Sequence, residues 1–163
     1  MLELGTGTGL TTLALASALQ FNGRGLLTTV DRGPDNVRRA AAVAARFGLE
    51  GLIRFVNAGS LDFIAADEGE PFDFVLFDTD IAVRHLEFDR LREKGRLAGL
   101  VAFHDTSRLR GRSMRDFNPA FIAGLDRIGR EHGLPGLENP LSRGLRLFQI
   151  QPRLESRHSR HPD

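Results

Sequence analysis

Short apolar segments alternate with amphipathic segments along most of the chain. The apolar segments contain β-branched and aromatic residues and are bounded by turn residues, which is typical of strands buried in a parallel sheet. We predict strands over residues 25–30, 53–56, 71–77, 99–103 and 144–151. Apolar spacing and helix-boundary residues predict helices over residues 11–21, 36–47, 60–66, 81–94 and 118–132. This alternation predicts an α/β fold with a doubly wound, mostly parallel sheet and helices on both faces.

The two ends of the chain are expected to differ from this regular pattern. Only Met1 and Leu2 precede Glu3, whereas a strand normally has about five or six residues. We therefore expect a clipped first strand or a missing N-terminal segment. Residues 1–151 are expected to form one domain, and residues 152–163, which have no apolar pattern, are expected to be a disordered tail.

Local residue types predict where some helices and loops begin. Asp35-Asn36 is expected to cap the second helix, and Ser60 can cap the third. Residues 134–143 are rich in proline and glycine, which favours a loop. Residues 107–116 are read as a polar, arginine-rich loop.

The overall composition excludes few functions. With 163 residues, 41% hydrophobic residues and a net charge of +1, the chain reads as one globular domain without a global preference for nucleic acid. The absence of cysteine excludes disulfides and thiolate metal sites. No apolar run is long enough to span a membrane and no signal peptide precedes the first glycines, so a cytoplasmic location is expected by default.

The first distinctive motif is the glycine-rich stretch ELGTGTGL at residues 3–10. It lies where a strand is expected to lead into a helix. Gly5, Gly7 and Gly9 permit a tight turn and let a ligand approach the backbone. The helix that follows would direct unpaired N–H groups towards that ligand.

Polar residues follow three later strands. Asp31, Asp78 and the pair His104-Asp105 each stand at the carboxyl end of a predicted strand, as does the glycine loop. Doubly wound sheets bind ligands at this edge, where the strand order reverses. The convergence of these residues predicts a ligand site there.

The glycine spacing distinguishes two nucleotide cofactors. Dinucleotide-binding loops have the pattern G-x-G-x-x-G, but Gly9 follows Gly7 by two positions and Leu10 stands where the third glycine should be. Glu3 before the loop also suits a cationic ligand better than a pyrophosphate. Asp31 can accept hydrogen bonds from the ribose of any adenosine ligand, so it does not discriminate between the two.

These residues together resemble the class I S-adenosylmethionine-dependent methyltransferases. The pattern E-x-G-x-G-x-G with an acid at the next strand end carries the resemblance. FDFVLFDTD at residues 72–80 and GLVAFHDT at residues 99–106 are similar to the small-molecule O-methyltransferases related to catechol O-methyltransferase. The resemblance covers about residues 2–106. It implies a Rossmann-like fold, S-adenosylmethionine as cofactor and O-methylation of a small molecule.

The resemblance also implies which residues contact the cofactor. The glycine loop would surround the methionine part, Asp31 would hold the ribose, the turn after the third strand would lie along the adenine, and Asp78 would close the inner end. The implied cofactor-binding residues are Glu3, Gly5, Thr6, Gly7, Gly9, Asp31, Arg32, Ala58, Gly59, Ser60 and Asp78.

For catalysis, the resemblance implies either a metal or a protein base. Metal-dependent relatives hold a divalent ion that chelates a vicinal diol, and the matching positions are Asp78, Asp105 and Thr106. Thr106 departs from the family's usual asparagine. The family's lysine after the fourth-strand acid is also missing, so His104, with Asp105 beside it, is the candidate catalytic base.

Other functions remain open at this point. The absent lysine and short start favour a non-catalytic S-adenosylmethionine-binding or interaction protein on the same fold. A nicotinamide-dependent oxidoreductase is opposed by the glycine spacing, and an iron-dependent hydroxylase-like relative could use Asp78, His104 and Asp105. The expected partners are S-adenosylmethionine, a small-molecule acceptor, Mg²⁺ if a metal is used, and a second copy of the chain in a homodimer.

Overall fold

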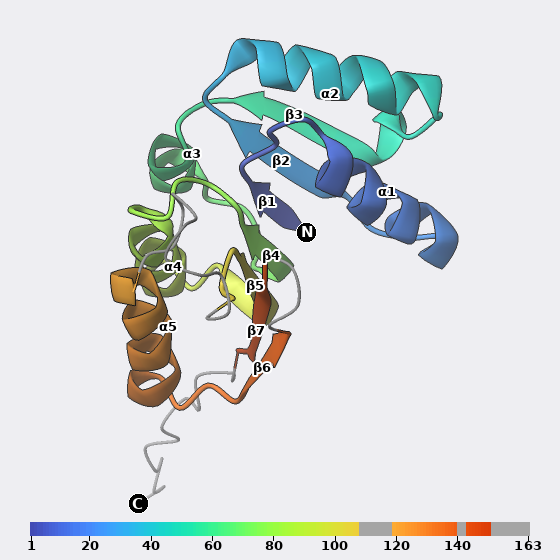
Figure 1. Ribbon diagram of the computed structural model, residues 1–163. Coiled ribbons are helices and arrows are strands. Elements are labelled where there is room, and N and C mark those ends of the chain that lie inside the picture. Colours follow the sequence, from blue (N-terminus) through green and yellow to red (C-terminus); the bar gives the residue numbers. More distant parts are fainter. Residues whose placement is uncertain (108–118, 140–142, 151–163) are drawn as a thin grey trace, which may run out of the picture.

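A computed structural model describes residues 1–107, 119–139 and 143–150 (Figure 1). Seven strands form one sheet in the order β3-β2-β1-β4-β5-β7-β6. The strands are β1 (Leu2–Leu4), β2 (Leu27–Asp31), β3 (Ile53–Asn57), β4 (Phe72–Phe77), β5 (Leu97–His104), β6 (Gly136–Asn139) and β7 (Leu145–Gln149). The helices are α1 (Leu10–Asn22), α2 (Pro34–Arg46), α3 (Ser60–Ala66), α4 (Arg84–Glu93) and α5 (Pro119–Glu131), with a 3₁₀ turn at Glu50–Leu52.

The predicted doubly wound, mostly parallel sheet is confirmed. Strands β1 to β5 are parallel, while β7 pairs antiparallel with both β5 and β6. The chain runs outward from β1 to β2 and β3, and then returns to place β4 on the other side of β1. The strand order therefore reverses between β1 and β4, which is where such sheets form their ligand crevice.

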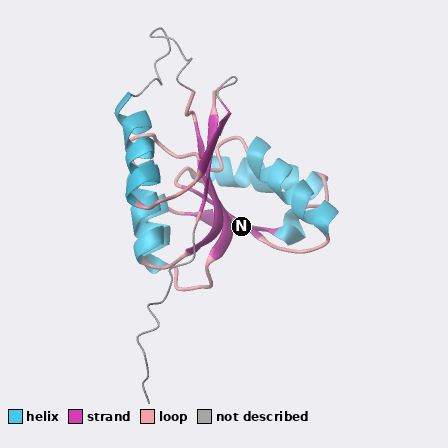
Figure 2. Ribbon diagram, turned by 90° about the horizontal axis from the view of Figure 1, so that it is seen from below, coloured by secondary structure: helices cyan, strands magenta, loops and turns pink. Residues whose placement is uncertain are grey.

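Helices cover both faces of this sheet, and each face has its own apolar core. Helices α1 and α2 lie on one side, and α4 and α5 lie on the other (Figures 1 and 2). The smaller core packs α1 and α2 against β2 and β3 through residues such as Ala16, Leu27 and Ala44. The larger core joins the central strands to α3, α4 and α5.

Stacked phenylalanines fill the centre of the larger core. The rings of Phe77 on β4 and Phe103 on β5 are stacked with their centroids 4.5 Å apart. Phe88 from α4 and Phe148 from β7 contact Phe103 at 6.0 Å. All four side chains are buried, so this cluster fixes the spacing of β4 and β5 whose ends carry the polar site residues.

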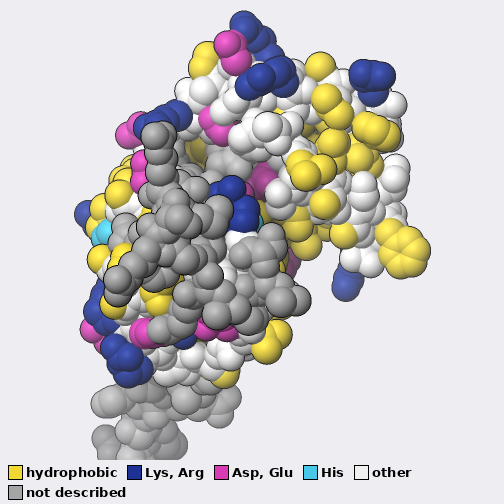
Figure 3. Space-filling model, viewed as in Figure 1, with side chains coloured by type: hydrophobic (Ala, Val, Ile, Leu, Met, Phe, Trp, Pro, Cys, Tyr) yellow, Lys and Arg dark blue, Asp and Glu magenta, His cyan; other side chains and the backbone are white. Residues whose placement is uncertain are grey.

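Large hydrophobic side chains are exposed on and near helices α1 and α2. Phe21 and Leu10 of α1, together with Leu26 and Phe47, are mostly exposed. Figure 3 shows hydrophobic side chains gathered over this region.

Within the part of the chain that the structure describes, none of the helices is both long enough and apolar enough to cross a bilayer.

Three local expectations are wrong. Residues 134–143 include strand β6, which is held by its pairing with β7 although its sequence contains glycine and polar residues. Helix α2 begins at Pro34 with Gly33 as N-cap, so Asp35-Asn36 lies inside its first turn. Helix α3 has Gly59 as N-cap, and Ser60 does not cap it because its hydroxyl bonds to a side chain of α4.

Two other expectations lie outside the described residues. Of the predicted arginine-rich loop at residues 107–116, the structure describes only Ser107. The tail at residues 152–163 lies outside the described residues as well. The division into a domain and a tail therefore stays a prediction.

Removing the ring of Phe103 is expected to destabilise the protein. Phe103→Ala leaves a cavity beside four other phenylalanine rings, so we expect the free energy of unfolding to fall by about 3–5 kcal/mol. Phe21→Ala is the matched control, because Phe21 is 93% exposed and should change stability by less than about 0.5 kcal/mol. Urea denaturation followed by circular dichroism measures both. Equal losses for the two variants would contradict the assignment of Phe103 to the core.

Candidate active site

A cleft of about 550 Å³ lies at the carboxyl edge of the sheet where the strand order reverses. Its walls come from the glycine loop after β1 and from the segments that follow β2, β3 and β4. The lining residues predicted from the sequence are Gly5, Gly7, Asp31, Arg32, Ala58, Gly59, Ser60 and Asp78. Thr79 and Asp80 also line the cleft.

The three glycines of the loop have different positions: Gly5 and Gly7 line the cleft, whereas Gly9 packs behind it. Gly5 has φ 100°, and a Cβ there would overlap the carbonyl oxygen of Asp78. Gly7 has φ 52° and open space where its Cβ would lie, so its backbone faces the cleft without obstruction. Gly9 instead packs against Ala40 of α2 and serves as the N-cap of α1. The loop thus needs glycine for different reasons at each position.

Asp31 at the end of β2 holds the loop in place. Its Oδ2 accepts a hydrogen bond from the N–H of Gly7 at 2.8 Å, and its Oδ1 accepts one from the N–H of Gly33 at 2.7 Å. The amide of Asn36 donates to the same Oδ1 at 3.2 Å. A carboxylate has about four lone-pair positions, and these three bonds leave capacity for a ligand in the cleft.

Glu3 lies behind the glycine loop and is not one of the residues that line the cleft. Its side chain is buried in β1, where Oε2 accepts hydrogen bonds from Thr12 at 2.5 Å and Thr29 at 2.6 Å. Thr29 also bonds to Thr6 at 2.7 Å, so the buried chain of polar groups reaches the loop. Oε1 is buried with no hydrogen-bond partner among the described residues.

This environment changes the acidity of Glu3. Burial raises the pKa of its carboxyl to about 7, although the two threonine hydroxyls act in the opposite direction. The charges of Asp78 and Asp31 raise the pKa further. Glu3 therefore changes its charge near neutral pH, directly behind the loop.

Ser60 and Thr79 connect the cleft wall to α4. Both hydroxyls donate to the carboxylate of Glu87, Thr79 at 2.8 Å to each oxygen. Glu87 is fully buried. Burial raises its pKa, against the effect of these hydrogen bonds and of the Arg84 charge. The cleft residues after β3 and β4 are thereby fixed to one helix.

The ends of β4 and β5 bring together three of the predicted side chains. Potential ligand atoms of Asp78, His104 and Asp105 lie within 4.8 Å of one another. His104 Nδ1 is 2.9 Å from Asp78 Oδ1. Since an ionised carboxylate can only accept, the hydrogen of this bond is on Nδ1, and in the neutral imidazole Nε2 is then the acceptor nitrogen.

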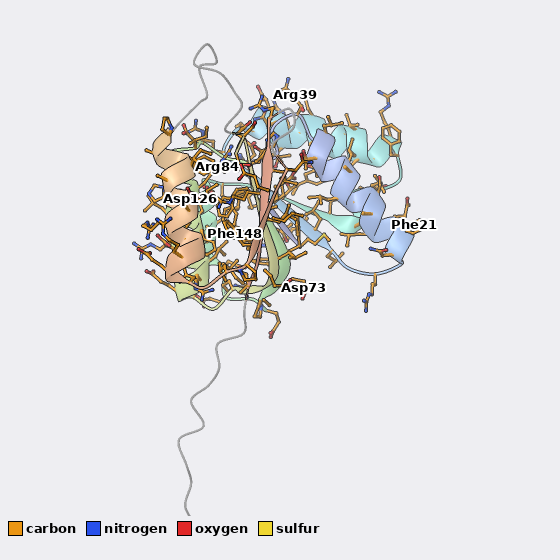
Figure 4. The ribbon with its side chains drawn as sticks, turned by 60° about the horizontal axis from the view of Figure 1, so that its bottom comes forward. Phe21, Arg39, Asp73, Arg84, Asp126 and Phe148 are labelled. Atoms are coloured by element: carbon orange, nitrogen blue, oxygen red, sulfur yellow. The ribbon has the colours of Figure 1, made fainter. Side chains whose placement is uncertain are left out.

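A fourth side chain, Arg84 from the first turn of α4 (labelled in Figure 4), contacts the same cluster. Its guanidinium is 3.3 Å from Asp78 Oδ1 and 3.5 Å from Asp105 Oδ2. It also donates to the backbone carbonyls of Thr79 and His104. Burial lowers the pKa of Arg84, whereas the charges of Asp78 and Asp105 raise it.

The predicted metal ligands do not fit a Mg²⁺ site well. Asp105 already accepts from Arg143 through Oδ1 at 2.5 Å and faces Arg84 through Oδ2. Burial raises the pKa of Asp105, but the hydrogen bond from Arg143 and the neighbouring positive charges outweigh it and lower the pKa overall. Mg²⁺ prefers oxygen ligands and strict octahedral geometry, while the third clustered side chain is a histidine.

Thr106, the third metal position implied by the sequence, is fully buried. Its hydroxyl has no hydrogen-bond partner among the described residues. Asp105 beside it has φ 61°, an uncommon backbone angle for a residue other than glycine. The turn after β5 is thus unusual, and the metal assignment remains a prediction that this geometry disfavours.

Sequence reasoning missed Arg84 and Glu87. Arg84 lies three positions after Ile81, four before Phe88 and seven before Leu91. Helical periodicity therefore places it on the apolar face of α4. A charged residue on such a face is a signal for a buried ion pair. Glu87, one turn later, gives the same signal.

The model of a family described as a methyltransferase domain matches residues 2–106. The sequence has no significant match among the curated proteins compared.

Several solved structures share the fold. The O-methyltransferase TomG of Streptomyces achromogenes, solved with S-adenosylmethionine, has a TM-score of 0.71 and 21% identity, covering 93% of this chain and 72% of TomG. A Podospora anserina methyltransferase with bound S-adenosylhomocysteine has a TM-score of 0.69 and 16% identity, covering 93% and 71%. A Bacillus cereus O-methyltransferase with the same ligand has a TM-score of 0.66 and 20% identity, covering 92% and 73%.

The raised pKa of Glu3 predicts how stability depends on pH. Between the ordinary value of 4.5 and about 7, the folded protein holds a proton that the unfolded chain has released. The free energy of unfolding therefore falls as the pH rises through this range, by up to about 3 kcal/mol. Glu3→Gln cannot titrate and should lack this contribution.

Urea denaturation of both proteins at several values between pH 5 and pH 8 tests this prediction. Subtracting the free energy of unfolding of Glu3→Gln from that of the wild type removes the contributions that the other titrating groups make to both proteins. As the pH rises, the variant should become more stable relative to the wild type. A difference that stays constant over the whole range would show that Glu3 titrates normally.

Proposed function

Because the chain belongs to the methyltransferase domain family, we propose that it binds S-adenosylmethionine in the cleft and methylates an oxygen of a small molecule. The observation that carries the proposal is the position of Asp31. It stands at the end of β2, lines the cleft and fixes the backbone of Gly7. One carboxylate therefore joins the glycine loop to the place where a ribose would be held.

The shape of the cleft supports a nucleoside ligand. Its volume of about 550 Å³ is within the usual range for small-molecule sites, roughly 300–1,000 Å³. The wall contains the backbone of Gly7, which no side chain covers where its Cβ would lie, and the apolar side chains of Ala58 and Leu61. S-Adenosylmethionine and its product S-adenosylhomocysteine are the ligands bound in the neighbouring structures named above.

The bound cofactor would supply an electrophilic methyl group on its sulfonium, so the chain must orient the acceptor and take up a proton. His104 is the proposed base. Its Nδ1–H is held by Asp78 at 2.9 Å, and its Nε2 can accept the hydroxyl proton of the acceptor as the oxygen forms its bond to carbon. Asp78 lines the cleft, which links the base to the cofactor site.

Glu3 would act from behind the loop in this proposal. Its carboxyl lies outside the cleft lining and connects to the loop through Thr29 and Thr6. We propose that it holds the loop geometry and that its negative charge, once formed, favours a cationic ligand.

Removing Asp31 should weaken cofactor binding. Asp31→Ala loses the charged acceptor at the strand end and frees the Gly7 backbone, so we expect about 10- to 100-fold weaker binding of S-adenosylhomocysteine. Isothermal titration calorimetry measures this. Asp35→Ala is the matched control, because Asp35 is exposed, pairs with Arg38 and does not line the cleft.

The same titrations distinguish the alternative ligand. A wild-type chain that binds a nicotinamide dinucleotide in preference to S-adenosylhomocysteine would contradict the proposal. Equal affinities for wild type and Asp31→Ala would contradict the assigned role of Asp31.

Replacing the base should separate binding from catalysis. His104→Gln is expected to keep its affinity for S-adenosylhomocysteine within about twofold, while the rate of transfer of labelled methyl to a panel of phenolic acceptors falls by about 10²- to 10⁴-fold. His85→Gln is the control and should transfer at the wild-type rate, because His85 lines a separate cavity beside α5 and is not one of the residues that line the cleft. Methyl transfer by His104→Gln at the wild-type rate would exclude His104 as the base, and cofactor binding without any transfer would favour a non-catalytic protein.

A further inference from the structure

The cluster at the ends of β4 and β5 contains its own buried cation. We propose that the Arg84 guanidinium takes the place of a divalent metal ion between Asp78 and Asp105, so that this site holds no metal. The inference rests on the proposed methyl transfer and deepens it, because it also limits the class of acceptor. Arg84 is 2% exposed, so it acts as a positioning residue behind the site.

The contacts of Arg84 show why it is fixed there. One edge of the guanidinium donates to the carbonyl of Thr79, with Nε at 2.9 Å and a terminal nitrogen at 2.5 Å. The other terminal nitrogen donates to the carbonyl of His104 at 2.6 Å. The ring of Phe121 from α5 covers it, with the guanidinium carbon 5.5 Å from the ring centroid. One side chain therefore joins the ends of β4 and β5 and is covered by a helix.

Among the residues that the structure describes, arginine side chains already face both carboxylates of the cluster. Asp78 and Asp105 contribute two carboxylates, and Arg84 and Arg143 contribute two guanidiniums in contact with them. A bridging ion would need oxygens of Asp78 and Asp105 at about 2.1 Å. Asp78 Oδ1 and Asp105 Oδ2 face Arg84, and Asp105 Oδ1 accepts from Arg143. A divalent ion there would be repelled by a cation that its backbone contacts hold in place.

This arrangement has a consequence for the acceptor. Two neighbouring hydroxyl groups are useful to an enzyme when an ion chelates them together. Without an ion, one hydroxyl within reach of His104 is sufficient. We therefore infer that the acceptors are compounds with a single reacting hydroxyl, and that a second, vicinal hydroxyl gives no advantage.

Binding of Mn²⁺, a paramagnetic substitute for Mg²⁺, tests the proposal without an activity assay. Electron paramagnetic resonance of free Mn²⁺ titrated with the wild-type chain should show no stoichiometric binding at micromolar concentrations of ion and protein. Stoichiometric binding in that range that is lost in Asp78→Asn would overturn the proposal.

Two variants of Arg84 sharpen the test. Arg84→Met removes the charge but keeps an unbranched stem, and it should gain Mn²⁺ binding that a second change, Asp78→Asn, abolishes. Arg84→Lys keeps the charge and should not gain it. A folded Arg84→Met chain, checked by circular dichroism, that binds no more Mn²⁺ than the wild type would contradict the claim that Arg84 occupies the metal position. If the variant does not fold, the wild-type titration alone decides.

Calorimetry with S-adenosylhomocysteine on the same preparations separates this inference from the proposed function. A wild-type chain that binds neither Mn²⁺ nor S-adenosylhomocysteine contradicts the proposed function while the absence of a metal site stands. With an active chain, transfer to a phenol and to its catechol analogue should be unchanged by EDTA. A loss of transfer in EDTA that Mg²⁺ restores would overturn the inference.

Discussion

The contact between Gly5 and the backbone of Asp78 sets the geometry of the whole cleft. β1 and β4 are neighbours in the sheet, yet the chain leaves them in different directions, towards α1 on one face and α4 on the other. Their ends can separate into a crevice only if the first turn after β1 passes close to β4. A glycine at position 5 allows this approach, because any Cβ would overlap the Asp78 carbonyl. The glycine loop and the polar cluster therefore share one wall.

That shared wall connects two groups of buried charges. On the β1 side, Glu3 is held by threonine hydroxyls and reaches the loop through Thr29 and Thr6. On the β4 side, Arg84 holds the strand ends together. Neither charge lines the cleft. The surface that a ligand would meet is thus made of backbone and of residues whose positions depend on charged groups behind them.

Much of the fold was predictable from local sequence. The alternation of apolar and amphipathic segments placed β2 to β5, β7 and the five α-helices of the described residues, because buried strands and amphipathic helices have distinct patterns. The pairing of β6 could not be found this way, since Gly136–Asn139 is held by a partner strand and lacks a strong pattern of its own. The caps at Gly33 and Gly59 were missed because Asn36 bonds to Asp31 at the end of β2 and Ser60 bonds to Glu87 of α4, so neither side chain caps its own helix.

The residues of the candidate site, like the elements of the fold, were only partly predictable from the sequence. The glycine loop, Asp31 and Asp78 were predictable because strand ends converge by topology alone. Arg84 was not recognised, since its role depends on the carbonyls of Thr79 and His104, which only the packing of α4 brings together. The burial of Glu3 likewise depends on Thr12 of α1 and Thr29 of β2. The roles of the individual side chains in binding and catalysis remain predictions.

The central position of β1 has a consequence for how the molecule folds. β1 is the first strand in the chain, but its partners are made much later: Leu2 pairs with Thr28 on one side and with Val75 on the other. Contacts between residues so far apart in sequence form slowly, because a long loop must close before they contribute any stability. The two walls of the crevice can therefore meet only after about half of the chain is organised, and a ligand that contacts both walls would bind only after that point in folding.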